Sequence, residues 1–245
     1  MKKQILSVLS LLLIASATLF AQEDQWADLV NEDPQEFSVS GDSFTYGSHV
    51  YTMTSSFNLK RNAIGSGKVT FTNVPSGFEE FKTVYQEFLG KTPHGAAAMV
   101  PMAMEIYGRD RETGKKCLEL LCYSSSTVSS ALSILADKIK TGDSYAQRYL
   151  PAACLDGASY TNAYSPSKPY TIKMKPSVNK PREMWSGDVV FYIYLDGTGG
   201  WDTTQRSVEV AWPLESEEGL FKAFNFPALY TQCRNIRGGK WQGLD

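Results

Sequence analysis

The chain has 245 residues, of which 42% are hydrophobic and 20% charged, and its formal net charge is −2. This composition is ordinary for a folded protein, and the length is enough for one substantial core or two small ones. A mildly acidic chain without basic clusters argues against binding to nucleic acid or to an anionic membrane surface.

The first 21 residues have the pattern of a secretory signal peptide. Lys2 and Lys3 precede an apolar run from Ile5 to about Ala15, and small residues then lead to Ala21. This order of positive charge, apolar segment and small-residue exit is typical of export signals. Because the run is shorter than the roughly 20 apolar residues of a transmembrane helix, we expect no membrane span in the mature chain.

Cleavage after Ala21 is the main prediction, and cleavage after Ala17 is an alternative that fits the small-x-small rule better. We expect the mature protein to be periplasmic or secreted. No cysteine precedes Cys117, so an acylated lipoprotein is not expected. Residues 22–42 are polar and predict a leader, and residues 43–245 then form a single domain.

Alternating apolar residues predict strands at the start of this domain. Residues 44–53 indicate a strand or hairpin around Gly47, and residues 68–74 alternate cleanly between two faces.

The middle of the chain is helical. Ser76 and Glu79 have the spacing of a capping box at the start of one helix, and Pro93 suits the first turn of the next. Residues 96–107 carry one charged side chain, which predicts a central core helix that Pro101 kinks or breaks. Further helical segments are expected at about 114–122, 126–139 and 143–150.

Four cysteines follow the signal region, at Cys117, Cys122, Cys154 and Cys233. An even number permits disulfides in an oxidising compartment. Cys117 and Cys122 share one predicted helix, where their Cα atoms would lie about 8 to 9 Å apart, beyond the roughly 7 Å limit for a bridge. Their spacing also fails the close pairs that bind zinc. We therefore expect buried free thiols, with no metal site and no cofactor.

Strands return in the last third of the chain. Residues 170–175 and 189–195 alternate, and residues 208–212 and 220–226 predict a hairpin around an acidic turn. Helices cluster in the middle and strands lie at both ends, without regular βαβ alternation. This segregation predicts an α+β fold, an antiparallel sheet with the central cluster of helices packed on one face.

Several short segments share a pattern with a known family. They are Phe-Glu-Glu-Phe at 78–81, the segments 88–93, 95–98 and 107–110, and Gly-Gly-Trp-Asp at 199–202 followed by Arg206. With them the chain resembles, over most of residues 70–230, a family of exported bacterial proteins described only as a domain of unknown function. It departs from that pattern at residues 202–206, where Asp-Ser-Pro-Arg-Pro is expected. The resemblance implies an α+β domain in the envelope or outside the cell, and it brings no reaction or catalytic residues.

Two constellations could carry catalysis, and each has a simpler interpretation. A hydrolase of the serine–histidine type would need His49 or His94 beside a nucleophile and an acid, and the chain has no Gly-x-Ser-x-Gly elbow. His94 is more simply a residue at a helix start. The run Glu105, Arg109, Asp110, Arg111 and Glu112 could supply a carboxylate pair for glycoside hydrolysis, but Glu105 and Arg109 have the spacing of a helix-surface ion pair. We expect no catalytic activity.

Aromatic and polar residues late in the chain are the candidate binding residues. Residues 196–202 faintly resemble a calcium loop, although a tight turn between strands explains their glycines without a metal. Aromatic rings offer large, rigid contact areas for sugars or proteins, although strands also favour them. The candidates are Tyr192, Tyr194, Trp201, Asp202 and Arg206.

These features predict an exported, non-catalytic domain that binds a ligand or an envelope protein, or that has a structural role. The first alternative is a carbohydrate-binding module, and the second is a hydrolase.

Overall fold

The computed structural model describes residues 37–139, 147–197, 205–215, 218–231, 233–237 and 241–244. The predicted signal peptide and most of the predicted leader lie outside these residues. Strand β1 (Phe37–Tyr46) begins before residue 43, so the boundary predicted between leader and domain falls inside this strand.

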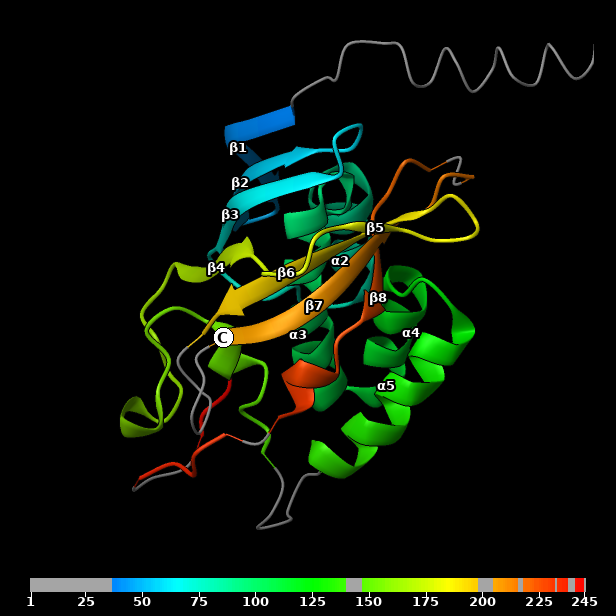
Figure 1. Ribbon diagram of the computed structural model, residues 1–245. Helices are drawn as coiled ribbons and strands as arrows, with labels where there is room; N and C mark the ends of the chain where they lie inside the picture. Colours follow the sequence, from blue (N-terminus) through cyan, green and yellow to red (C-terminus); the bar gives the residue numbers. More distant parts are fainter. Residues whose placement is uncertain are drawn as a thin grey trace, which may run out of the picture. The chain divides into compact units, whose positions relative to one another are not determined.

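The described strands form one antiparallel sheet in the order β1-β2-β3-β4-β6-β7-β8, and β5 pairs with β6 (Figure 1). The third strand begins at Ala63, five residues earlier than predicted, and the predicted hairpin of the last two strands is confirmed. After β1, the strands are β2 (His49–Asn58), β3 (Ala63–Phe71), β4 (Tyr170–Pro176), β5 (Arg182–Glu183), β6 (Val189–Asp196), β7 (Gln205–Trp212) and β8 (Lys222–Asn225).

The α-helices lie between β3 and β4 in the chain, and α3 packs against β2, β3, β6, β7 and β8. The predicted α+β fold is therefore confirmed. Residues 148–150 form a turn and residue 147 is not helical, so the described end of the helix predicted at 143–150 is wrong, and residues 143–146 lie outside the described part. The α-helices are α2 (Phe78–Glu87), α3 (Pro93–Arg109), α4 (Arg111–Leu121) and α5 (Ser125–Lys138), and the 3-10 helices are η1 (Leu89–Lys91), η2 (Ala152–Cys154), η3 (Tyr160–Asn162) and η4 (Pro227–Tyr230).

Helix α3 is the centre of the core, as predicted. Every residue from Pro93 to Tyr107 is buried. The Thr92 side chain caps the helix by accepting a hydrogen bond from the Gly95 amide at 3.0 Å. The alternative of a break at Pro101 is wrong, because α3 runs without interruption to Arg109. Packing on all sides offsets the one backbone hydrogen bond that a proline removes.

The start of α2 differs in detail from the prediction. The backbone amide and the hydroxyl of Ser76 both donate to Glu80 Oε2, at 2.7 and 2.8 Å. The predicted capping box with Glu79 is therefore wrong by one residue. Glu79 is exposed, whereas Glu80 is buried beside the sheet, where Tyr51 also donates to its carboxylate at 2.7 Å.

The four cysteines are all free and buried, as predicted. Burial raises the pKa of Cys117, Cys122 and Cys154 to about 12, so these thiols stay protonated at neutral pH. Within the described ranges, no helix has the length and apolarity needed to cross a bilayer.

Candidate functional site

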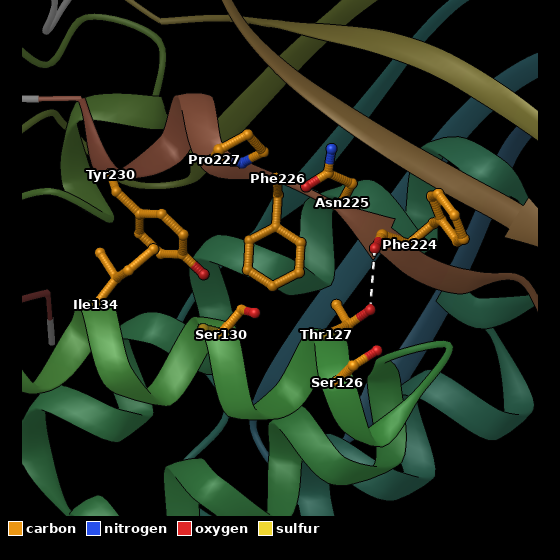
Figure 2. A pocket seen from close by; sticks show the side chains of 10 residues that line it. Ser126, Thr127, Ser130, Ile134, Phe224, Asn225, Phe226, Pro227 and Tyr230 are labelled. Atoms are coloured by element: carbon orange, nitrogen blue, oxygen red, sulfur yellow. Dashed lines mark hydrogen bonds between the residues drawn. The ribbon is translucent and has the colours of Figure 1, made fainter.

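A groove with a volume of about 220 Å³ separates α5 from the segment that joins β8 to η4. We call it the α5–η4 groove (Figure 2). Ten residues line it: Ser126, Thr127, Ser130, Ala131, Ile134, Phe224, Asn225, Phe226, Pro227 and Tyr230.

The two walls meet because the chain after α4 pairs with β8. Cys122 forms a parallel bridge with Ala223, and the Tyr123 amide donates to the Ala223 carbonyl at 2.8 Å. Ser124 follows immediately and caps α5 by accepting from the Thr127 amide at 3.2 Å. The first turns of α5 are thereby fixed next to β8.

Helical spacing determines which side chains of α5 line the groove. Positions three and four apart lie on one face of a helix, so Ser126, Ser130 and Ile134 lie along the same side. Thr127 closes one end of the groove, because its hydroxyl donates to the Phe224 carbonyl at 3.1 Å (Figure 2). The α5 wall is therefore rich in hydroxyl groups and partly exposed.

The opposite wall is mainly aromatic. The Phe226 and Tyr230 rings are 5.7 Å apart and tilted against each other. The Tyr230 hydroxyl points into the groove toward α5 (Figure 2), and no other described residue forms a hydrogen bond with it. Burial, and then the nearby Cys122, raise the pKa of Tyr230. This hydroxyl is therefore a protonated donor without an acceptor among the described residues.

None of the described lining residues carries a charge. Next to the groove, the Asn225 amide nitrogen donates to Glu209 Oε1 at 3.0 Å, which holds that side chain in place. Hydroxyl groups, one amide and aromatic faces suit an uncharged ligand that combines polar groups with apolar faces.

The binding residues predicted from the sequence do not gather at this groove. Trp201 and Asp202 lie outside the described residues. Tyr192 and Tyr194 are half-buried and alternate along β6 with the buried Phe191 and Ile193, so they occupy the opposite face of the sheet from the core.

Arg206 is buried and its guanidinium is used inside the protein. Nη1 donates to the carbonyl oxygens of Ala228 and Thr231, each at 3.0 Å, and Nη2 lies 3.0 Å from the sulfur of Cys233. These acceptors surround the end of η4, the element that carries Tyr230. Arg206 therefore holds a wall of the groove from behind.

His94 belongs to the core. Its Nε2 lies 3.1 Å from the Gly65 carbonyl and its Nδ1 lies 2.7 Å from the Ser55 hydroxyl. Since a carbonyl only accepts, Nε2 carries the proton and Ser55 donates to Nδ1. Burial lowers the pKa of His94 to about 4. The Ser55 and His94 side chains are both buried. This burial agrees with the simpler interpretation of His94 as a structural residue at the start of a helix.

The ion pair between Glu105 and Arg109 is formed, with 3.1 Å between Glu105 Oε1 and Arg109 Nε. Its predicted surface position is wrong, because Glu105 is completely buried on a helix that is covered on all sides.

The calcium-like loop at 196–202 can be followed only at its start, where Asp196 pairs with Lys175 at 3.1 Å. No cluster of three potential metal-binding side chains occurs among the residues that the structure describes.

Sequence reasoning missed the α5–η4 groove. Two sequence features pointed to its walls: the serine-rich start of α5 and the Phe-Asn-Phe segment at 224–226. The helix and the strand that carry these features were both predicted, but their contact was not. Their contact depends on the bridge between Cys122 and Ala223, which no local pattern indicates.

Comparison with known proteins gives one match. A family described as "Domain of unknown function (DUF6935)" matches residues 73–237. No curated protein and no solved structure matches the chain.

Proposed function

The chain belongs to the DUF6935 family, a domain of unknown function, and we propose that it is an exported, non-catalytic domain that binds an uncharged glycan in the α5–η4 groove. Export rests on the charged, apolar and small-residue pattern of residues 1–21. Binding rests on the groove itself, where the hydroxyl groups of Ser126, Thr127 and Ser130 on one wall face aromatic rings on the other.

A sugar combines the two properties that this groove complements. Its hydroxyl groups would bond with Ser130 and Tyr230, and its C–H faces would pack on the rings of Phe226 and Tyr230. The volume of about 220 Å³ is below the roughly 300–1,000 Å³ of pockets for drug-sized ligands. The groove is thus suited to about one sugar residue of a larger glycan.

The lining also supports a binding role rather than a catalytic one. Among the described lining residues, Tyr230 is the one with a titratable side chain, and burial keeps it protonated. General acid–base catalysis needs a group whose pKa lies near the working pH. A glycosidase would need two carboxylates flanking the scissile bond, and the described lining contributes none.

A pair of phenylalanine substitutions on α5 tests the groove. Ser130→Phe places a ring inside the groove and should abolish binding, because the volume holds only about one ring-sized group. Ser129→Phe is the matched control, since Ser129 is also exposed on the same helix but does not line the groove. Wild type and both variants would be tested on an array of neutral mono- to hexasaccharides, followed by calorimetry with the best-bound sugars.

Tyr230→Phe gives a finer test. Loss of one hydrogen bond of about 1 kcal/mol should weaken binding of the same sugars about fivefold. The proposal is wrong if wild type binds no neutral saccharide, or if Ser130→Phe and Ser129→Phe bind equally well.

Export is tested by the mass of the mature protein. The full chain would be expressed in a bacterial host, and protein from the periplasm and the medium measured intact. Cleavage after Ala21 leaves Gln22 as the first residue, and cleavage after Ala17 leaves Thr18. Exported protein that retains Met1 would contradict the proposed signal peptide.

A further inference from the structure

Trp185 is fully exposed in the turn between β5 and β6. Scattered exposed apolar side chains are normal on a protein surface, so exposure alone assigns no role. The turn that carries Trp185, however, is held unusually firmly.

Asp188 organises this turn from a buried position. Its Oδ1 accepts from the Leu214 amide at 2.7 Å, and its Oδ2 accepts from the hydroxyls of Ser186, at 2.8 Å, and Tyr123. Two backbone hydrogen bonds complete the turn, from the Met184 amide to the Asp188 carbonyl at 2.8 Å and from the Gly187 amide to the Met184 carbonyl at 2.9 Å. The backbone beneath Trp185 is therefore fixed before any ligand arrives, which lowers the entropy cost of binding.

The same contacts connect the turn to the α5–η4 groove. The Tyr123 ring, whose hydroxyl bonds Asp188, packs edge-on against Phe224 with 5.3 Å between the ring centroids. The Arg182 guanidinium on β5 lies 5.9 Å from the centre of the same Phe224 ring. Phe224 stands at the Thr127 end of the groove (Figure 2). A chain of side-chain contacts thus leads from the groove through Phe224 and Tyr123 to the turn.

We propose that Trp185 is a second contact for the ligand of the α5–η4 groove, which is an uncharged oligosaccharide with one sugar in the groove and a further sugar stacked on the Trp185 indole. This inference rests on the proposed function. A rigid, exposed indole offers a flat apolar face to the C–H side of a sugar ring at low entropy cost.

The charges near the turn favour this neutral ligand over an anionic membrane. Arg182 is paired with Glu209 at 3.9 Å, and the exposed Lys180 and Glu183 carry opposite charges. Attraction to anionic lipids needs an excess of basic side chains, and these four charges balance.

The test compares Trp185→Ala with Val178→Ala, which removes another exposed apolar side chain from the segment that leads into the same hairpin. Calorimetry would use a neutral disaccharide and hexasaccharide of one series that the groove binds. In wild type the hexasaccharide should bind more tightly than the disaccharide. Trp185→Ala should weaken hexasaccharide binding about tenfold, in line with aromatic stacking and the apolar area that it buries, and leave disaccharide binding unchanged. Val178→Ala should change neither.

The outcomes separate this inference from the proposal on which it rests. If no neutral saccharide binds, both fail. If the disaccharide binds in the groove but the hexasaccharide gains nothing, or if Trp185→Ala and Val178→Ala behave alike, the role of Trp185 is wrong and the groove stands. Trp185-dependent binding to phosphatidylglycerol vesicles, with saccharide binding unaffected by Trp185→Ala, would assign the indole to a lipid surface and overturn the inference.

Discussion

Glu105 shows how a single residue can bring charge into an apolar core. Its Oε1 pairs with Arg109, whereas its Oε2 has no hydrogen-bond partner among the described residues. Burial raises the pKa of Glu105, against the opposing effect of Arg109 and Arg148. Arg109 also donates to the Leu244 carbonyl, and the Arg148 guanidinium lies 5.2 Å from the centre of the Trp241 ring. The Glu105 carboxylate thus attracts the Arg109 and Arg148 guanidinium groups, which in turn contact Leu244 and Trp241.

Glu105→Gln keeps the volume of this side chain and removes its charge. Arg109 and Arg148 would then face each other without a carboxylate. Breaking a buried charge cluster in this way should lower the free energy of unfolding by about 3 kcal/mol, measured by urea denaturation. Glu112→Gln, at an exposed position in the first turn of α4, should change it by less than about 0.5 kcal/mol. Equal stability of the two variants would mean that Glu105 is uncharged in the folded protein.

At the scale of residues, the sequence indicates which side chains are spaced to pair with each other better than it indicates which side chains are buried. The four-residue separation of Glu105 and Arg109 predicted their ion pair, yet neither residue indicated that Glu105 is buried. Arg206 shows the same limit. It was a binding candidate because of its place after a glycine-rich segment, and it is buried because the end of η4 folds over it. Which side chains a distant segment covers is decided by tertiary packing.

At the scale of elements, the hydrophobic period predicted the α-helices and the later strands well, whereas the predicted capping box was wrong by one residue. Thr92 and Ser124 begin their helices as hydrogen-bonding caps. Close approaches were not predictable. A Cβ atom at Gly114 would lie 2.1 Å from the Tyr107 Cα, so α3 and α4 meet where only glycine fits. Such contacts, like the bridge that forms the groove, join residues through space and leave no periodic signal in the sequence.

At the scale of the whole molecule, three buried titratable groups with lowered pKa values should make the protein less stable in acid, and the raised pKa of Glu105 acts in the opposite direction. Burial alone would raise the pKa of Glu80 and Asp188, but hydrogen bonds to their carboxylates outweigh it and lower both values. For Glu80 these come from Ser76, Tyr51 and His49, and for Asp188 from Tyr123, Leu214 and Ser186. Burial lowers the pKa of His94 from 6.5 to about 4. All three groups bind protons more weakly in the folded protein than in the unfolded chain.

The protein should therefore lose stability in acid in two stages. Between pH 6.5 and about 4, His94 is protonated in the unfolded chain but stays neutral in the folded protein. This difference should lower the free energy of unfolding by about 3 kcal/mol as the pH falls through the range. Stability falls further as the pH drops below the ordinary pKa values of Glu80 (4.5) and Asp188 (3.8) and passes their lowered values in the folded protein. Urea denaturation at half-unit steps from pH 7.5 to about 2 would cover both stages. His94→Gln, which is neutral at every pH, should remove the first stage and keep the second, whereas His49→Gln should retain the first. If His94→Gln loses as much stability as wild type between pH 6.5 and 4, then His94 is not the neutral, buried group that controls this stage.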